Sequence, residues 1–116
     1  MSGSRAVTTA TLGLVLLLLS GCQGALIGDW RMISAGQSRH VFSIERASFR
    51  EDGSFETRTT VEGVTLDEKG RYEFNGVKLR LWPAGGGLRM YTATLGPGRV
   101  TLMNGKRSVV LERARG

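Results

Sequence analysis

From residue 26 onward, hydrophobic positions alternate with polar ones over short runs separated by turn residues. The clearest run covers residues 55–61, whose one face is formed by Phe55, Thr57, Thr59 and Val61. A period of two is typical of a β-strand with one dry and one wet face. Because no helical period is present in this part of the chain, the pattern predicts an all-β domain.

About eight runs of this kind follow one another, and tight turns separate them. They lie within residues 26–32, 42–49, 55–61, 72–74, 77–81, 88–95, 100–102 and 109–113. Asp52-Gly53, Asn75-Gly76 and Asn104-Gly105 are strong hairpin signals, and residues 67–70 are predicted as a further turn. The alternation changes phase between residues 44 and 47, which predicts a β-bulge near Arg46.

The connections between these runs are too short for parallel strands, which need crossovers of a dozen or more residues. An antiparallel, up-and-down order is therefore expected. Closing about eight such strands into a small barrel removes the exposed sheet edges. An open sheet or a two-layer sandwich is the alternative.

Residues 1–21 have the three-part layout of a secretory signal peptide. Arg5 follows the N-terminus, a run rich in leucine covers residues 12–19, and Ser20 and Gly21 come before Cys22. The uncharged stretch of residues 6–21 is shorter than the roughly 20 residues of a membrane-spanning helix. An uncleaved membrane anchor is the less favoured alternative.

The sequence Leu19-Ser20-Gly21-Cys22 resembles the lipobox of bacterial lipoproteins. The resemblance implies cleavage before Cys22 and attachment of acyl chains to this residue, with residues 22–25 as the lipidated tether. A free thiol after an ordinary signal peptide is the alternative. In Gram-negative lipoproteins an Asp after the Cys retains the protein at the inner membrane. Gln23 therefore implies the outer membrane, facing the periplasm, if the source is Gram-negative.

Four short motifs in order resemble the small lipocalin-like barrels of bacterial lipoproteins. They are Gly28-Asp29-Trp30, Asp52-Gly53-Ser54-Phe55, Gly70-Arg71-Tyr72 and Leu111-Glu112-Arg113. The resemblance covers residues 26–116 and implies a lipocalin-like domain, in which a first-strand Trp closes the barrel floor beneath a last-strand Arg. Trp30 and Arg113 take these places, and a solvated Arg113 is the alternative.

The chain departs from ligand-carrying lipocalins in its short strands, its short first connection and its lack of a C-terminal helix. An eight-stranded barrel has room for side chains or for one small ligand. The expected inward residues can fill it, and they are Trp30, Met32, Phe42, Phe55, Tyr72, Phe74, Leu79, Leu102 and Leu111. A carrier of a small apolar ligand remains an alternative, but a large cavity is not expected.

Length and composition limit the chemistry further. The chain has 116 residues, and removing residues 1–21 leaves 95, enough for one small domain. Its only His is His40, and its only Cys is the candidate lipid acceptor. Glu51-Asp52 and Asp67-Glu68 are interpreted as solvated turn acids, and Gly85–Gly87 lacks the Lys and the helix of a phosphate loop. We therefore expect no enzyme, cofactor or metal site.

The surplus of Lys and Arg over Asp and Glu bears on the partners that the chain could bind. The 16 Lys and Arg residues outnumber the 10 Asp and Glu residues, and without Arg5 the balance is 15 to 10, or +5. The cations are spread over every strand, whereas a nucleic-acid binder would cluster them. We expect no nucleic-acid partner, and the excess cations favour attraction to anionic lipid or polysaccharide.

Together these observations predict a lipid-anchored protein of the cell envelope with a non-enzymatic binding or structural role. The membrane, through Cys22, is the first expected partner, and a protein or polysaccharide is the second. Trp82 is the candidate contact residue, with packing at the barrel rim as the alternative. Inhibition of an envelope-directed enzyme is a minor alternative.

Overall fold

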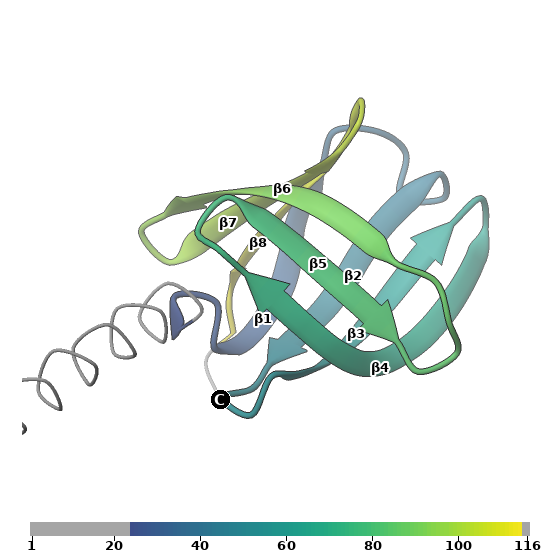
Figure 1. Cartoon of the computed structure of the whole chain (residues 1–116). Coiled ribbons are helices and arrows are strands. Elements are labelled where there is room, and N and C mark those ends of the chain that lie inside the picture. Colours follow the sequence, from purple (N-terminus) through teal and green to yellow (C-terminus); the bar gives the residue numbers. More distant parts are fainter. Residues whose placement is uncertain (1–23, 115–116) are drawn as a thin grey trace, which may run out of the picture.

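The structure is a computed structural model that describes residues 24–114, and these residues form a closed antiparallel β-barrel (Figure 1). Its strands are β1 (Gly28–Ala35), β2 (Phe42–Phe49), β3 (Ser54–Val61), β4 (Val64–Phe74), β5 (Lys78–Pro83), β6 (Arg89–Gly96), β7 (Arg99–Asn104) and β8 (Arg107–Arg113). The predicted all-β class and the strand number are confirmed.

Each strand pairs with the next one in the chain, and β1 pairs with β8 to close the barrel. In that closing pair Trp30 lies opposite Arg113, and Met32 lies opposite Leu111. The barrel is therefore confirmed over the open sheet and the sandwich. Because every wall strand has a neighbour on both sides, most main-chain groups are paired within the sheet.

A single hydrophobic core fills the inside of the barrel, since alternate residues of every strand point inward. Its buried members are Leu26, Trp30, Phe42, Ile44, Ala47, Phe49, Phe55, Tyr72, Phe74, Leu79, Leu81, Tyr91, Ala93, Val100, Leu102, Val109 and Leu111. Of the nine residues expected inside, only Met32 is partly rather than fully buried. The aromatic rings pack edge to face at Phe49 and Tyr72, whose centroids lie 5.0 Å apart.

The bulge expected near Arg46 is present, because the register between β2 and β3 shifts between Ile44 and Arg46. A second shift lies between Met32 and Ser34 in the pairing of β1 with β8. Such bulges increase the local twist, which helps a sheet of short strands to close.

The turn predicted at residues 67–70 is wrong. These residues lie inside β4, and the turn between β3 and β4 is Glu62-Gly63, with positive φ values of 49° and 81°. Gly70 has a different role from a turn glycine. A Cβ atom there would lie 2.0 Å from the Trp82 carbonyl oxygen, so the glycine lets β4 and β5 approach closely.

The first strand also begins later than its pattern predicted. Leu26 precedes β1 and lies in a turn that the Ile27 N–H closes by donating to the Gly24 carbonyl at 3.1 Å. Leu26 is nevertheless fully buried, because this turn folds across one end of the barrel and inserts the side chain into the core. We call this end the floor and the opposite end, where the Glu62-Gly63 turn lies, the mouth.

Candidate functional site

At the floor, Trp30 of β1 and Arg113 of β8 come together. The Arg113 guanidinium carbon lies 4.4 Å from the centre of the indole ring, which is an arrangement that attracts a cation to the negative ring face. The Trp30 side chain is buried, and its Nε1–H donates to the Leu26 carbonyl at 2.9 Å. Arg113 covers the ring from the solvent side and is itself exposed.

Arg113 also holds the segment through which the chain enters the barrel. Its Nη1 donates to the Ile27 carbonyl and its Nη2 to the Ala25 carbonyl, each at 2.8 Å. Gly28 makes room for this arrangement, because a Cβ atom there would lie 2.8 Å from Nη1 and its φ is +133°. The entry of the chain at Gly24 is therefore fixed against the floor.

Several sequence-predicted features lie outside the described residues. These are the signal segment of residues 1–21, the candidate lipid acceptor Cys22, and Gln23. The described chain begins at Gly24, two residues after Cys22.

The outer wall of β2, β3 and β4 carries an open, polar hollow of about 470 Å³. Its lining includes Arg46, Ser48, Glu56, Arg58, Asp67 and Lys69. The pairing registers place Arg46 opposite Arg58 and Arg58 opposite Asp67 on this wall. Charges of both signs therefore alternate over a shallow surface, which suits a solvated face better than a catalytic cleft.

Most of the acids on this wall are bound by neighbours. Arg58 makes two hydrogen bonds to Asp67, at 2.9 and 3.1 Å, and these hold the pKa of Asp67 below its usual value. On the adjoining strands Arg31 pairs with Glu112 at 2.7 Å. These exposed pairs contribute little to stability, but they neutralise the wall.

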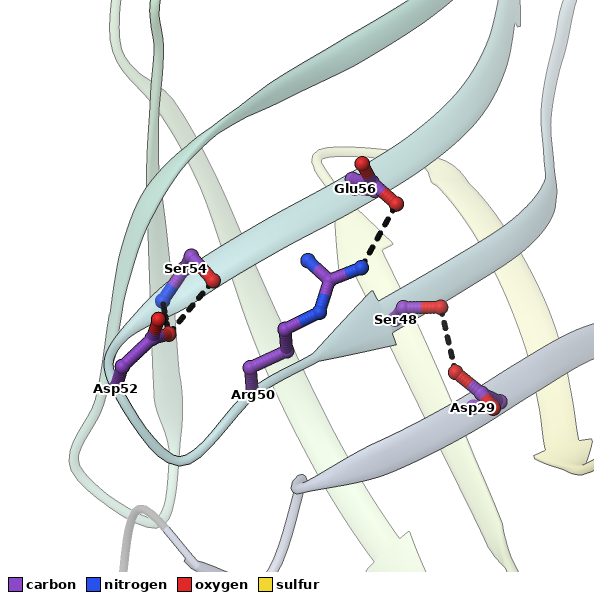
Figure 2. Close-up of polar contacts among 6 residues, drawn as sticks. All are labelled: Asp29, Ser48, Arg50, Asp52, Ser54 and Glu56. Atoms are coloured by element: carbon purple, nitrogen blue, oxygen red, sulfur yellow. Dashed lines mark hydrogen bonds and ion pairs between the residues drawn. The ribbon is translucent and has the colours of Figure 1, made fainter.

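Figure 2 shows the floor end of the same wall. Arg50 donates to Glu56 at 2.9 Å, and Ser48 donates to Asp29 at 2.7 Å. Asp52 accepts hydrogen bonds from the Ser54 hydroxyl and main-chain N–H, at 2.6 and 2.9 Å, which lower the pKa of Asp52. This carboxylate therefore stabilises the Asp52-Gly53 hairpin turn.

An ion pair near the mouth joins two strands that are not neighbours in the sheet. Glu68 of β4 and Arg89 of β6 meet beyond the end of β5, with Oε2 3.0 Å from Nη2 and Oε1 2.9 Å from Nε. The Glu68 side chain is only 15% exposed. Below it, burial raises the pKa of the Tyr91 phenol above its ordinary value of 10.0.

Sequence reasoning missed the Glu68–Arg89 pair because it placed a turn at residues 67–70. A signal for the longer strand was nonetheless present. With the turn at Glu62-Gly63, the even-numbered residues from 64 to 74 continue one inward face and bring Glu68 inside.

His40 lies in the connection between β1 and β2 at the mouth and is exposed. Its ring packs against Gly63, where a Cβ atom would lie 2.6 Å from the ring carbon Cε1. The neighbouring Glu62 pairs with Arg107 of β8 at 2.6 Å. These contacts join the β1–β2 connection and the β3–β4 turn to the start of β8 at the mouth.

Trp82 is 38% exposed on the outer face of β5, where it lies opposite Arg71 of β4. Two other exposed apolar residues, Val77 and Leu95, lie toward the floor. The other exposed large apolar side chains lie in the mouth half of the barrel, and they are Val64, Leu66, Leu88, Met90 and Met103. The chain therefore exposes apolar surface mainly beside β4, β5 and β6.

Residues 24–114 contain no cluster of three His, Cys, Asp or Glu residues that could hold a metal ion. Over the same residues, no helix has the length and apolar character needed to cross a membrane. A scan of protein-family models, a search of curated proteins and a search of solved structures found no match.

Proposed function

We propose that this chain is an exported lipoprotein, anchored in a membrane through acyl chains on Cys22. Its barrel serves as a non-enzymatic binding or structural module of the cell envelope. The observation that carries the proposal is the floor, where Arg113 clamps the chain at Ala25 and Ile27. A lipid on Cys22 would be joined to a rigid barrel by no more than three residues.

The short tether restricts where the barrel can lie. Residues 23–25 span at most about 10 Å when fully extended. The floor would therefore lie against the bilayer and the mouth would point away from it. In a Gram-negative cell, Gln23 after the acylated Cys22 favours the periplasmic face of the outer membrane.

The distribution of side chains supports a role for the outer surface rather than the interior. Large apolar residues occupy the inside of the barrel. In contrast, the hollow on the outer wall and a second hollow between residues 66–69 and 83–85 are open to solvent, and both lie along β4. Binding at the exposed apolar surface near the mouth is therefore favoured over carriage of a ligand in the core.

The test is mass spectrometry of the protein purified from its native membrane, together with fractionation of a Cys22→Ser variant. We expect the native chain to begin at Cys22 and to carry the mass of acyl chains. We expect the Cys22→Ser variant to lack that mass. We also expect that it does not accumulate as the mature, membrane-bound form.

Gln23→Ala is the matched control, because it alters the tether but keeps the thiol and should remain acylated. An unmodified N-terminus at Met1 in the native protein would refute the anchor. The same conclusion would follow if Cys22→Ser were processed and retained in the membrane like the native chain.

A further inference from the structure

The strand β4 extends beyond its neighbour β5 at the mouth. Pairing between them runs from Phe74 opposite Leu79 to Gly70 opposite Pro83. One further bond joins the Ala84 N–H to the Lys69 carbonyl at 2.8 Å. Residues 64–68 continue to pair with β3, but on the other side no strand of the described chain accompanies them.

This free edge presents main-chain donors and acceptors. In an antiparallel sheet, successive residues direct their N–H and C=O groups to opposite neighbours. Lys69 bonds toward the β5 side, whereas the Tyr72 N–H bonds to the Gly53 carbonyl on the β3 side. By this alternation Thr65 and Asp67 direct their main-chain groups to the free edge.

Two apolar side chains beside the edge are exposed, although they lie on the inner face of the barrel, where side chains are normally buried. Val64 and Leu66 lie on the inner face of β4, opposite Val61 and Thr59. They are nevertheless 58% and 48% exposed. They lose their cover because β5 ends before it reaches them.

A hollow of about 300 Å³ runs along the same edge. Leu66–Lys69 line it on one side and Pro83–Gly85 line it on the other. Leu88, in the connection between β5 and β6, adds another side chain that is half exposed. An apolar side chain from an added strand would enter this hollow next to Leu66.

The charges around the edge select the kind of strand that fits. Its two acids are already engaged, Asp67 by Arg58 and Glu68 by Arg89. Lys69 and Arg71 have no side-chain hydrogen bond or ion pair within residues 24–114. The charge left without a partner is therefore positive.

We propose that the free edge of β4 at residues 64–68 binds an extended segment of a partner protein as an additional strand, and that this segment alternates apolar with acidic residues. Its main chain would pair with Thr65 and Asp67, and its apolar side chains would cover Val64 and Leu66. Its carboxylates would meet Lys69, the first cation that follows the free edge on the outer face of β4. Addition of a strand to a free sheet edge is a general mode of peptide recognition.

This inference names the partner class of the proposed binding role and so rests on that role. The position of the free edge in the barrel is consistent with binding of a partner protein. Figure 1 shows the β3–β4 hairpin at the end of the barrel away from the start of the described chain. A floor held against a membrane would leave this edge accessible to a protein in the aqueous space.

The test uses the processed protein in detergent micelles and an eight-residue peptide of alternating Val and Glu. Calorimetry gives the affinity, and amide hydrogen exchange locates the bound peptide. We expect slower exchange at Thr65 and Asp67. A peptide N-methylated on the main-chain nitrogens that face β4, and one with Lys in place of Glu, should each bind about tenfold more weakly or worse, which corresponds to about 1.4 kcal/mol.

Variants of the edge show whether peptide binding depends on main-chain pairing or on side-chain charge. Thr65→Pro removes one edge donor and should weaken binding about tenfold, whereas Thr65→Val keeps that donor and should bind like the native chain. If Thr65→Pro does not fold, Lys69→Glu tests the charge preference by itself. Lys106→Glu, in the turn between β7 and β8, is the matched control and should leave the affinity unchanged.

The proposal is overturned if the Val-Glu peptide leaves the exchange of Thr65 and Asp67 unchanged, or if its N-methylated form binds equally well. Protection that appears without peptide and rises with protein concentration would assign the edge to a second copy of the chain. Protection by vesicles of anionic lipid alone would assign it to a membrane. An unacylated N-terminus would overturn the anchor without altering the peptide result.

Discussion

Gly70 shows how a single missing methyl group shapes this barrel. Its φ is not in the left-handed region, so the residue is needed for space rather than for a turn. The backbone of Trp82 and Pro83 passes so close that a Cβ atom would overlap the Trp82 carbonyl oxygen. The contact lies where β4 leaves β5 and continues toward the mouth paired with β3 only.

Gly70→Ala should therefore destabilise the protein by about 1–3 kcal/mol, because the two backbones must separate to admit the methyl group. Urea denaturation followed by circular dichroism would measure the change in the free energy of unfolding. Gly85→Ala is the control, since a Cβ atom there meets no atom within 4 Å. Equal stability of the two variants would show that the close approach is not needed.

At the scale of elements, the floor joins parts of the chain that are far apart in sequence. Trp30 belongs to the first strand and Arg113 to the last, and Arg113 also bonds to the turn that precedes β1. The pairing register sets Trp30 directly opposite Arg113. The floor therefore depends on closure of the barrel and also stabilises it.

Replacing Trp30 with Ala should lower the free energy of unfolding by about 3–5 kcal/mol, because it removes a large buried ring and leaves a cavity. Trp82→Ala is the matched control, since Trp82 lies partly exposed on the outer face, and it should change stability much less. Denaturant titration of both variants measures the difference. A loss below about 1 kcal/mol for Trp30→Ala would contradict its role as the floor residue.

At the scale of the whole molecule, closure makes β1 and β8 neighbours even though most of the described chain separates them. Pairing of β1 with β8 and the common core should make the wall strands unfold together. The exception is the free edge of β4, where Thr65 and Asp67 have no strand on one side.

Amide hydrogen exchange of the unbound protein should therefore separate two classes of residue. Amides of β1 and β8 that are paired with a neighbouring strand, such as those of Met32 and Leu111, should exchange at rates close to that of global unfolding. The amides of Thr65 and Asp67 should exchange much faster, since they face solvent. Equally slow exchange at Thr65 and Asp67 would show that the edge is already covered.

Much of the architecture was predictable because it follows from local rules. Alternation over residues 55–61 and the Asn75-Gly76 and Asn104-Gly105 turns fix strands and hairpins through neighbouring residues alone. The phase change near Arg46 likewise marked its bulge. The turn at residues 67–70 was wrong because acidic residues followed by Gly look like a turn when the neighbouring strand is unknown.

The sequence by itself determined the all-β class, the antiparallel order and most of the inward face, because a strand's period and its turns are encoded in adjacent residues. Only the tertiary structure decided the length of β4, the role of Gly70, the Glu68–Arg89 pair and the free edge at Thr65 and Asp67. These features depend on where β5 ends relative to β4 and β6. That relation is set by packing and register across the closed barrel, and no local pattern contains it.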